Sequence, residues 1–231
     1  MRKNEDTLQR IARYLMLHSS FINNIGLLNG KMGIAIFFFH YAKYTNNKLY
    51  ENFAGCLIDE IYAEININSP KDFKNGLCGI AWGMEYLIRN HFVQADADEV
   101  LEDIDKQILE RDVRRISDNS LETGLKGIAY YVISRCENSK KGKSSISKEY
   151  IIDLIASLDI NMRKDEESIF LSKQLKNILT QEDVHGTNKL LYMMSSQIKY
   201  KTKALFEEDR PLGIANSGYT GIGLKLLQEN S

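Results

Sequence analysis

The sequence predicts an all-α protein built as an array of about five helical hairpins, and three observations predict this fold class. A glycine signature, GxxG followed by Ile and a small residue, occurs four times on one period of about 47 residues. Amphipathic helical patterns lie between the copies, and apolar helical segments begin at the glycines. Because five such periods account for all 231 residues, we expect one continuous domain over residues 1–231.

The four copies of the signature define the period. Their first glycines are spaced by 46, 48 and 94 residues, and the last gap equals two periods. A degenerate copy is therefore expected near residues 168–179, where "SIFLSKQLKNIL" keeps apolar residues at helical spacing but has no glycine. The complete copies read "LLNGKMGIAI", "FKNGLCGIAW", "LETGLKGIAY" and "IANSGYTGIGL", and they lie within residues 26–36, 73–83, 121–131 and 214–224.

Each repeat is predicted to pair an outer helix with an inner one. Leu8, Ile11 and Leu15 follow the spacing of a helix with one buried face, as do the apolar residues of 151–158. The segments "GIAIFFFHYA" and "GIAYYVISRC" are apolar nearly all round and are predicted to be buried inner helices. We expect the glycines to permit positive φ angles and a close approach of neighbouring helices, so bulky replacements should reduce stability first.

Composition excludes several classes of function. Lys and Arg (30) nearly balance Asp and Glu (31), which argues against a nucleic-acid partner. The N-terminus lacks the features of a signal peptide, and no apolar stretch is long enough for a membrane span, so a cytoplasmic location is expected. Three cysteines, Cys56, Cys78 and Cys136, are widely spaced without a CxxC motif and are predicted to be buried free thiols.

Other chemistries find little support in the motifs. The GxxG pairs are not followed by GK[ST], and no strand precedes them, so a phosphate-binding loop is not predicted. The acidic residues Asp72, Glu85 and Glu122 lie near the turns and leave open a general acid and base pair, although a carboxylate beside a helix N-terminus is also stabilised by the helix dipole. If the turns converge, the lysines there would form a mildly basic or simply solvated rim; these are Lys31, Lys74 and Lys126.

Inner helices that open with GxxG and then Ile-Ala or Ile-Gly resemble those of the lanthionine synthetase C-like family. The resemblance spans the whole chain and implies an α/α toroid, in which the glycine turns gather at one mouth of an inner barrel. The best-known members are zinc enzymes that add a cysteine thiol of a ribosomally made peptide across a dehydroalanine or dehydrobutyrine. Zinc binds the thiolate and lowers the thiol pKa, which generates the nucleophile near neutral pH.

The family's zinc ligands are cysteines and histidines just before these glycines, and this sequence has neither there. The residues immediately before the first glycine are Asn29, Asn75, Thr123 and Ser217, and those one position earlier are Leu28, Lys74, Glu122 and Asn216. Cys78 lies between Gly76 and Gly79, out of register with a ligand. No metal site and no cofactor are therefore predicted.

The histidines supply one catalytic candidate. His185, followed by Gly186, is similar to the His-Gly pair of the family, but it is off the period. A helix N-terminus capped by a neighbouring Asp or Asn is the alternative reading of this segment. The remaining histidines, His18, His40 and His91, are expected to be packed or helix-end residues.

The residues expected to form turns or bind at the mouth of the barrel are those of the signatures. They are Asn29, Gly30, Gly33, Asn75, Gly76, Gly79, Glu122, Gly124, Gly127, Gly218 and Gly221. Five hairpins are fewer than the family's complete ring needs, which leaves three forms open: an incomplete arc, a smaller closed ring, or an arc completed by a second copy in a homo-oligomer.

Two function hypotheses follow, and the residues leave open whether the chain is an enzyme. The first is a lanthionine synthetase C-like protein related to the cyclases that mature ribosomally synthesised peptides, degenerate in catalysis. The second is a non-catalytic scaffold that binds a peptide or protein in such a modification system. The expected partner is thus a ribosomally made peptide or a modification enzyme.

Overall fold

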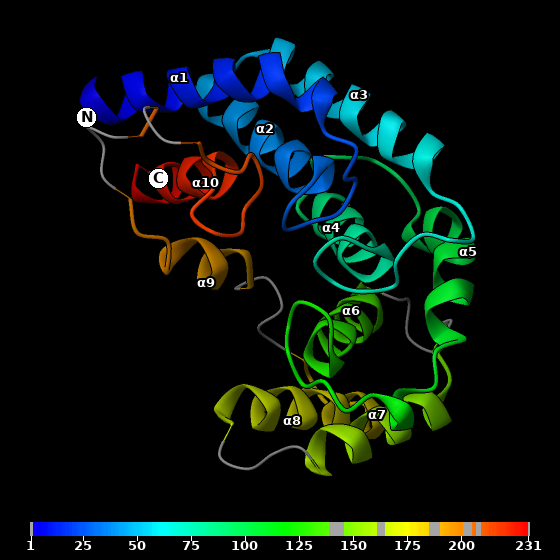
Figure 1. Ribbon diagram of the computed structural model, residues 1–231. Helices are drawn as coiled ribbons and strands as arrows, with labels where there is room; N and C mark the ends of the chain where they lie inside the picture. Colours follow the sequence, from blue (N-terminus) through cyan, green and yellow to red (C-terminus); the bar gives the residue numbers. More distant parts are fainter. Residues whose placement is uncertain are drawn as a thin grey trace. The chain divides into compact units, whose positions relative to one another are not determined.

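The computed structural model describes residues 2–138, 146–160, 165–184, 190–200, 205–206 and 209–230. All regular structure in these ranges is helical, with no strand, which confirms the predicted all-α class (Figure 1). The chain divides into two compact units. The terminal unit combines Met1–Asn66 with Lys189–Ser231, and the central unit is Ile67–Asn188.

The terminal unit brings the first and the last helices of the chain together. Helix α10 (Tyr219–Glu229) packs against α1 (Arg2–His18), α2 (Lys31–Thr45) and α9 (Leu190–Ser196), while α2 also packs along α3 (Lys48–Glu64). A short 3-10 helix, η1 (Ser19–Phe21), follows α1. Most of α2 and α10 is buried, whereas α1 and α3 bury only one face, as predicted for inner and outer helices.

The central unit holds the middle repeats. Its inner helices α4 (Leu77–Arg89) and α6 (Leu125–Asn138) pack against each other, and α5 (Ala97–Leu109) packs on α4. Helix α6 also contacts α7 (Lys148–Ile160) and α8 (Glu166–Thr180), which form a pair. The 3-10 helix η2 (Val113–Arg115) lies against α7.

The inner helices begin where the signature predicts. Helices α2, α4, α6 and α10 each start at the residue after the first glycine, so the "IAIFFF" run is helical. Helix α8 covers the predicted degenerate copy, but its burial differs from that of the other inner helices. It buries Leu171 and Leu175, while Ile169 and Phe170 are 50% and 36% exposed. The fourth repeat therefore keeps a helix over the expected segment, but this helix begins at Glu166, ahead of the period, and is not apolar all round like its companions.

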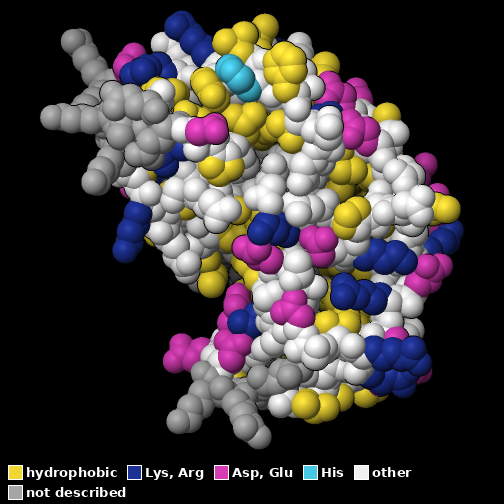
Figure 2. Space-filling model, viewed as in Figure 1, with side chains coloured by type: hydrophobic (Ala, Val, Ile, Leu, Met, Phe, Trp, Pro, Cys, Tyr) yellow, Lys and Arg dark blue, Asp and Glu magenta, His cyan; other side chains and the backbone are white. Residues whose placement is uncertain are grey.

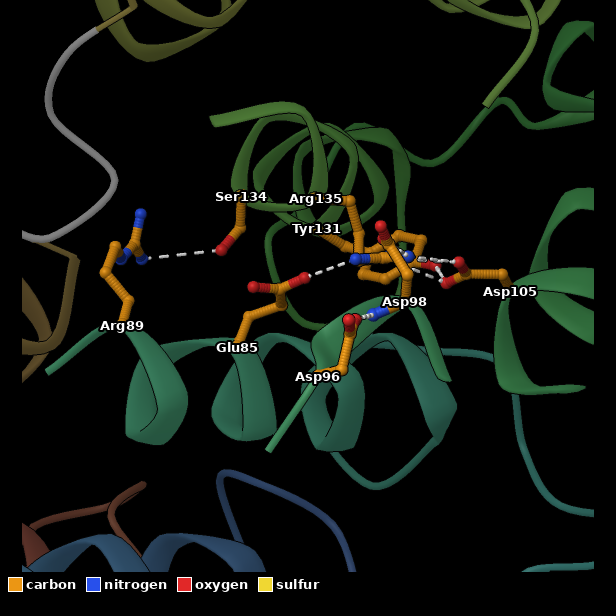
Figure 3. A network of polar contacts seen from close by, with 8 residues as sticks. All are labelled: Glu85, Arg89, Asp96, Asp98, Asp105, Tyr131, Ser134 and Arg135. Carbon is orange, nitrogen blue, oxygen red and sulfur yellow. Dashed lines mark hydrogen bonds and ion pairs between the residues drawn. The ribbon is translucent and has the colours of Figure 1, made fainter. Parts of the chain in front are cut away.

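A buried ion network joins three helices of the central unit (Figure 3). The guanidinium of Arg135 on α6 donates to Glu85 on α4 at 2.6 Å and to Asp105 on α5 at 2.8 Å. The three side chains are at most 3% exposed, and the outer carboxylate of Asp98 adds a contact at 3.0 Å. Buried charges are tolerated only with such partners, so the network fixes the helices to one another.

Candidate functional site at the glycine turns

The four glycine turns share one backbone contact. The first residue of each inner helix donates its N–H to a carbonyl at the start of the preceding loop. The donor and acceptor are seven residues apart in the first three turns and eight apart in the last. The pairs are Lys31 with Asn24 (2.9 Å), Leu77 with Pro70 (2.7 Å), Leu125 with Asp118 (2.9 Å) and Tyr219 with Pro211 (3.0 Å).

The first glycine of each signature is required by this contact. A Cβ added to Gly30 would lie 2.2 Å from the Asn24 carbonyl oxygen, and one added to Gly76 would lie 2.2 Å from that of Pro70. The φ angles of these two glycines are −131° and −118°, which other residues adopt. The expectation of positive φ is therefore wrong for these positions, because a close backbone approach, and not a left-handed conformation, selects glycine.

The second glycine lies one helical turn later and faces the same loop. A Cβ on Gly33 would be 2.3 Å from the carbonyl oxygen of Leu27, and one on Gly127 would be 2.4 Å from that of Leu121. Residues three apart share a helix face, so the preceding loop packs against both glycines of a signature. This geometry explains the GxxG spacing without a ligand.

The last turn accommodates its extra residue by backbone strain. Asn216 and Ser217 both have φ of 55°, in the left-handed region, directly before Gly218. Asn tolerates this region better than Ser does. These two residues occupy positions where the resemblance places metal ligands in some repeats.

The turns also contact one another in pairs. In the central unit, the amides of Phe73 and Lys74 donate to the Glu122 carbonyl at 3.1 and 2.9 Å. In the terminal unit, the amides of Ile214 and Ala215 donate to the Leu28 carbonyl at 2.7 and 2.9 Å. Glu122 and Leu28 both stand two residues before the first glycine. Equivalent turns therefore meet through the same backbone interaction in both units.

The lysines of the turns are engaged by carboxylates. Lys74 pairs with Glu122 at 2.5 Å. The buried Lys31 pairs with Glu60 and Glu64 at 3.0 and 2.7 Å. Burial alone would lower the pKa of Lys31, but the hydrogen bonds that it donates to the two glutamates raise the pKa above its usual value.

Lys126 follows the same pattern, since it contacts Asp165 and Glu167 of the next repeat at 2.7 and 2.8 Å. The three lysines thus neutralise local acids, and the basic rim considered from the sequence does not form. Basic and acidic side chains are likewise interspersed on the face shown in Figure 2.

The acids proposed as a general acid and base pair are also occupied. Glu85 is fully buried against Arg135, and Glu122 pairs with Lys74. Asp72 accepts the Asn75 amide at 2.7 Å. These contacts give each carboxylate a structural role in its own turn or helix pair.

Two adjoining depressions lie at the turns of the central unit. The larger, of about 630 Å³, is lined by Lys71, Asp72, Glu110, Arg111 and Thr123. The smaller shares Glu110 and Arg111 and extends along residues 112–118. Asp72 and Thr123 come from the second and third glycine turns, so the larger depression lies at their junction. Sequence reasoning missed Arg111, which lies between helices and belongs to no periodic pattern.

The thiols and histidines are scattered. Cys78 is fully buried in α4, and burial raises the pKa of its thiol well above the usual value. Cys136 is half-buried and Cys56 is exposed, so the prediction of three buried thiols is wrong for Cys56. The catalytic candidate His185 lies outside the described residues.

The other histidines occupy the expected kinds of position. His18 ends α1, and its ring stacks on Tyr14 with 4.1 Å between the centroids. His91 follows α4 with a φ of 58°, and His40 is half-buried within α2.

The chain matches the model of one known protein family. The family model for lanthionine synthetase C-like protein matches residues 21–188, most of the chain. The chain belongs to the lanthionine synthetase C-like family. The matched range ends before the signature at 214–224, yet the fourth turn repeats the backbone contact of the others. Neither a curated protein nor a solved structure matches the chain significantly.

The side chains at the turns do not fit the zinc of the family's cyclases. Asn29, Asn75, Thr123 and Ser217 precede the glycines, and none is a thiolate or an imidazole. Within the described ranges, no three His, Cys, Asp or Glu side chains are grouped to hold a metal ion. No helix in the same ranges is long and apolar enough to cross a membrane.

Proposed function

We propose that this lanthionine synthetase C-like protein binds a ribosomally synthesised peptide at its glycine turns, without catalysing zinc-assisted thiol addition. The observation that carries the proposal is the set of residues before the glycines. Asn29, Asn75, Thr123 and Ser217 stand where the family's chemistry needs Cys and His. Membership of the family supports a role in peptide maturation, and this set argues against the cyclisation step.

The chemistry of thiol addition explains why these positions matter. The nucleophile is a thiolate, and without a metal or a basic partner a peptide thiol is mostly protonated near neutral pH. Cys78, the thiol nearest to a glycine turn in sequence, lies in the protein interior with a raised pKa and is closed to solvent. The residues before the first glycines thus supply hydrogen-bonding groups but no thiolate or imidazole that could hold a metal and so activate a thiol.

The same turns are suited to holding a peptide. Their loops are fixed by backbone hydrogen bonds within and between repeats, so little ordering is needed on binding. The larger depression is lined by the charged side chains of Lys71, Asp72, Glu110 and Arg111. A rigid polar surface of this kind can bind a chain without changing it chemically.

Two measurements on the purified full-length protein test the proposal. Elemental analysis should find well under one equivalent of zinc per chain, also after incubation with zinc and gel filtration. A synthetic peptide with one cysteine and one dehydroalanine should lose its free thiol, measured by maleimide labelling, no faster with the protein than without it. Fluorescence anisotropy of the same peptide, labelled, should show saturable binding.

Each outcome bears on the proposal. One bound zinc together with accelerated thiol loss would establish a cyclase and overturn it. No saturable binding of peptide would overturn the scaffold role, whatever the zinc content.

A further inference from the structure

Arg111 is a cation at the turns of the central unit. It follows α5, is half-buried and lines both depressions. In the part of the chain that the structure describes, its guanidinium makes no hydrogen bond or ion pair, and only its backbone amide is bonded, to Ile108 at 3.1 Å. The remaining segments of this unit, 139–145, 161–164 and 185–188, contain no Asp or Glu.

The acids around Arg111 are each held by another group. Glu110 contacts Lys71 at 3.2 Å. Asp112 contacts Arg114 at 2.9 Å and Arg115 at 3.3 Å.

The two acids from the turns are held in the same way. Asp72 accepts the Asn75 amide, and Asp118 accepts the hydroxyl of Thr123 at 2.5 Å and the amide of Ser120 at 2.8 Å. A guanidinium carries five N–H donors, and among the described residues none of those of Arg111 is bonded to these acids.

On the interior side, Arg111 faces neutral groups. Its charge acts on Tyr150 and Cys78, but burial dominates and raises the pKa of both side chains, which therefore stay protonated. The hydroxyl of Tyr150 is itself buried without a hydrogen-bond partner among the described residues. Neither of these two groups supplies the negative charge that a partly desolvated guanidinium favours. The charge of Arg111 also acts on Asp118, but the pKa of Asp118 is lowered mainly by the hydrogen bonds from Thr123 and Ser120, and Arg111 forms no ion pair with it.

We infer that Arg111 and the depression that it lines form a binding site for a carboxylate, carried by an acidic residue of a peptide. A carboxylate accepts two parallel hydrogen bonds from one guanidinium. A phosphate dianion fits less well, because Asp72, Glu110 and Asp118 lie around Arg111 and would repel the second charge. Only the choice of a peptide as carrier rests on the proposed function.

The site can be tested with a small probe on the full-length protein. The side-chain Nε–Hε signals of ¹⁵N-labelled protein would be followed by NMR during titration with acetyl-Gly-Glu-Gly-amide. The matched probe is acetyl-Gly-Gln-Gly-amide, with ionic strength held constant by sodium chloride. We expect the glutamate probe to shift the Arg111 signal with at least tenfold tighter binding than the glutamine probe.

Variants assign the effect to Arg111. R111Q should lose the preference for the glutamate probe, and R111K should retain only part of it, since an ammonium cannot form the paired hydrogen bonds. R13Q is the control, because Arg13 is exposed on α1 and lines neither depression; it should bind as the wild type does. Thermal unfolding of each variant checks the fold, and the wild-type signal is informative even if R111Q does not fold.

Several results would overturn the site. These are equal binding of the two probes, an unchanged preference in folded R111Q, or perturbation of other arginines but not Arg111. Inorganic phosphate that competes as well as the glutamate probe at equal ionic strength would contradict the choice of a carboxylate. Because the probes contain neither cysteine nor dehydroamino acid, zinc-dependent cyclisation would overturn the proposed function while leaving this result intact.

Discussion

The carbonyl oxygen of Leu28 accepts a hydrogen bond from the amide of Ile214 at 2.7 Å. The contact joins the first glycine turn to the last one, and the same carbonyl also accepts from Ala215. Helix α10, which follows the last glycine turn, packs on α1 and α2. The end of the chain is thus a structural partner of its beginning, through the interaction that also joins the second and third turns.

Replacing the first glycine of a turn should be strongly destabilising. In Gly30→Ala the new Cβ would lie 2.2 Å from the backbone oxygen of Asn24, which cannot move without breaking the bond to Lys31. We expect the free energy of unfolding in urea to fall by about 2–4 kcal/mol. Gly55→Ala is the control: it is helical with open space around it and should gain up to about 1 kcal/mol. Equal stability of the two variants would disprove the close approach.

The strain in the last turn should be relieved by glycine. Ser217 has a φ of 55°, and Ser217→Gly removes the Cβ that disfavours this conformation. We expect a gain of up to about 1 kcal/mol in the free energy of unfolding, partly offset by the greater freedom of the unfolded chain. Asn29→Gly, at the same position of the first turn but without positive φ, should lose stability. A loss in Ser217→Gly would contradict the assignment of strain.

The helical repeat could be predicted from the sequence, because the GxxG spacing results from a contact between residues that are close in the chain. Gly30 and Gly33 lie on one face of a helical turn. Each allows close packing of a loop residue that lies six positions earlier in the chain. Because the contact is local, every complete copy of the repeat needs the same two glycines. The starts of the four complete inner helices could therefore be predicted, while the reason, close approach instead of positive φ, required coordinates.

The contacts between turns could not be predicted. The bonds from Phe73 to Glu122 and from Ile214 to Leu28 use backbone atoms only, and the side chains at these positions differ in character. The carboxylate partners of Lys31 and Lys126 lie on different elements in each case. Arg111 could not be predicted either, because it is distinguished by a guanidinium without a hydrogen bond or ion pair among the described residues, and this is a property of the folded chain.

The buried network should be sensitive to loss of its cation. Arg135→Met leaves Glu85 and Asp105 buried without their shared partner, and we expect the free energy of unfolding to fall by about 3–5 kcal/mol. The deficit should shrink at low pH, because protonation removes the charge of unpaired buried carboxyls. Arg115→Met, which breaks an exposed pair, should change stability by no more than about 0.5 kcal/mol. A deficit that does not vary with pH would contradict this explanation.

The three thiols should react at clearly different rates. Cys56 is exposed, Cys136 is half-buried, and Cys78 is fully buried with a raised pKa. In native protein treated with iodoacetamide, mass spectrometry should show Cys56 modified first and Cys78 last, with Cys78 protected even near pH 9. In urea all three should react alike. Rapid native labelling of Cys78 would contradict its burial and the argument that it is closed to solvent.

His40 should give the protein an acid-sensitive stability. Burial, with a smaller effect of Lys43, lowers the pKa of His40 from 6.5 to about 4. Between these values the unfolded chain binds a proton that the folded chain does not, so stability falls as pH decreases through this window and is unaffected above it. Compared with His40→Gln, the wild type should lose about 3 kcal/mol more between pH 7.5 and pH 4.

Urea unfolding at several pH values measures this difference, and NMR titration of the ring reports the folded-state pKa directly. His91→Asn is the control, since His91 is exposed and asparagine tolerates its left-handed backbone. This variant should keep the pH dependence of the wild type. A His40 ring that titrates near pH 6.5 in the folded protein would show that α2 is not packed around it as described.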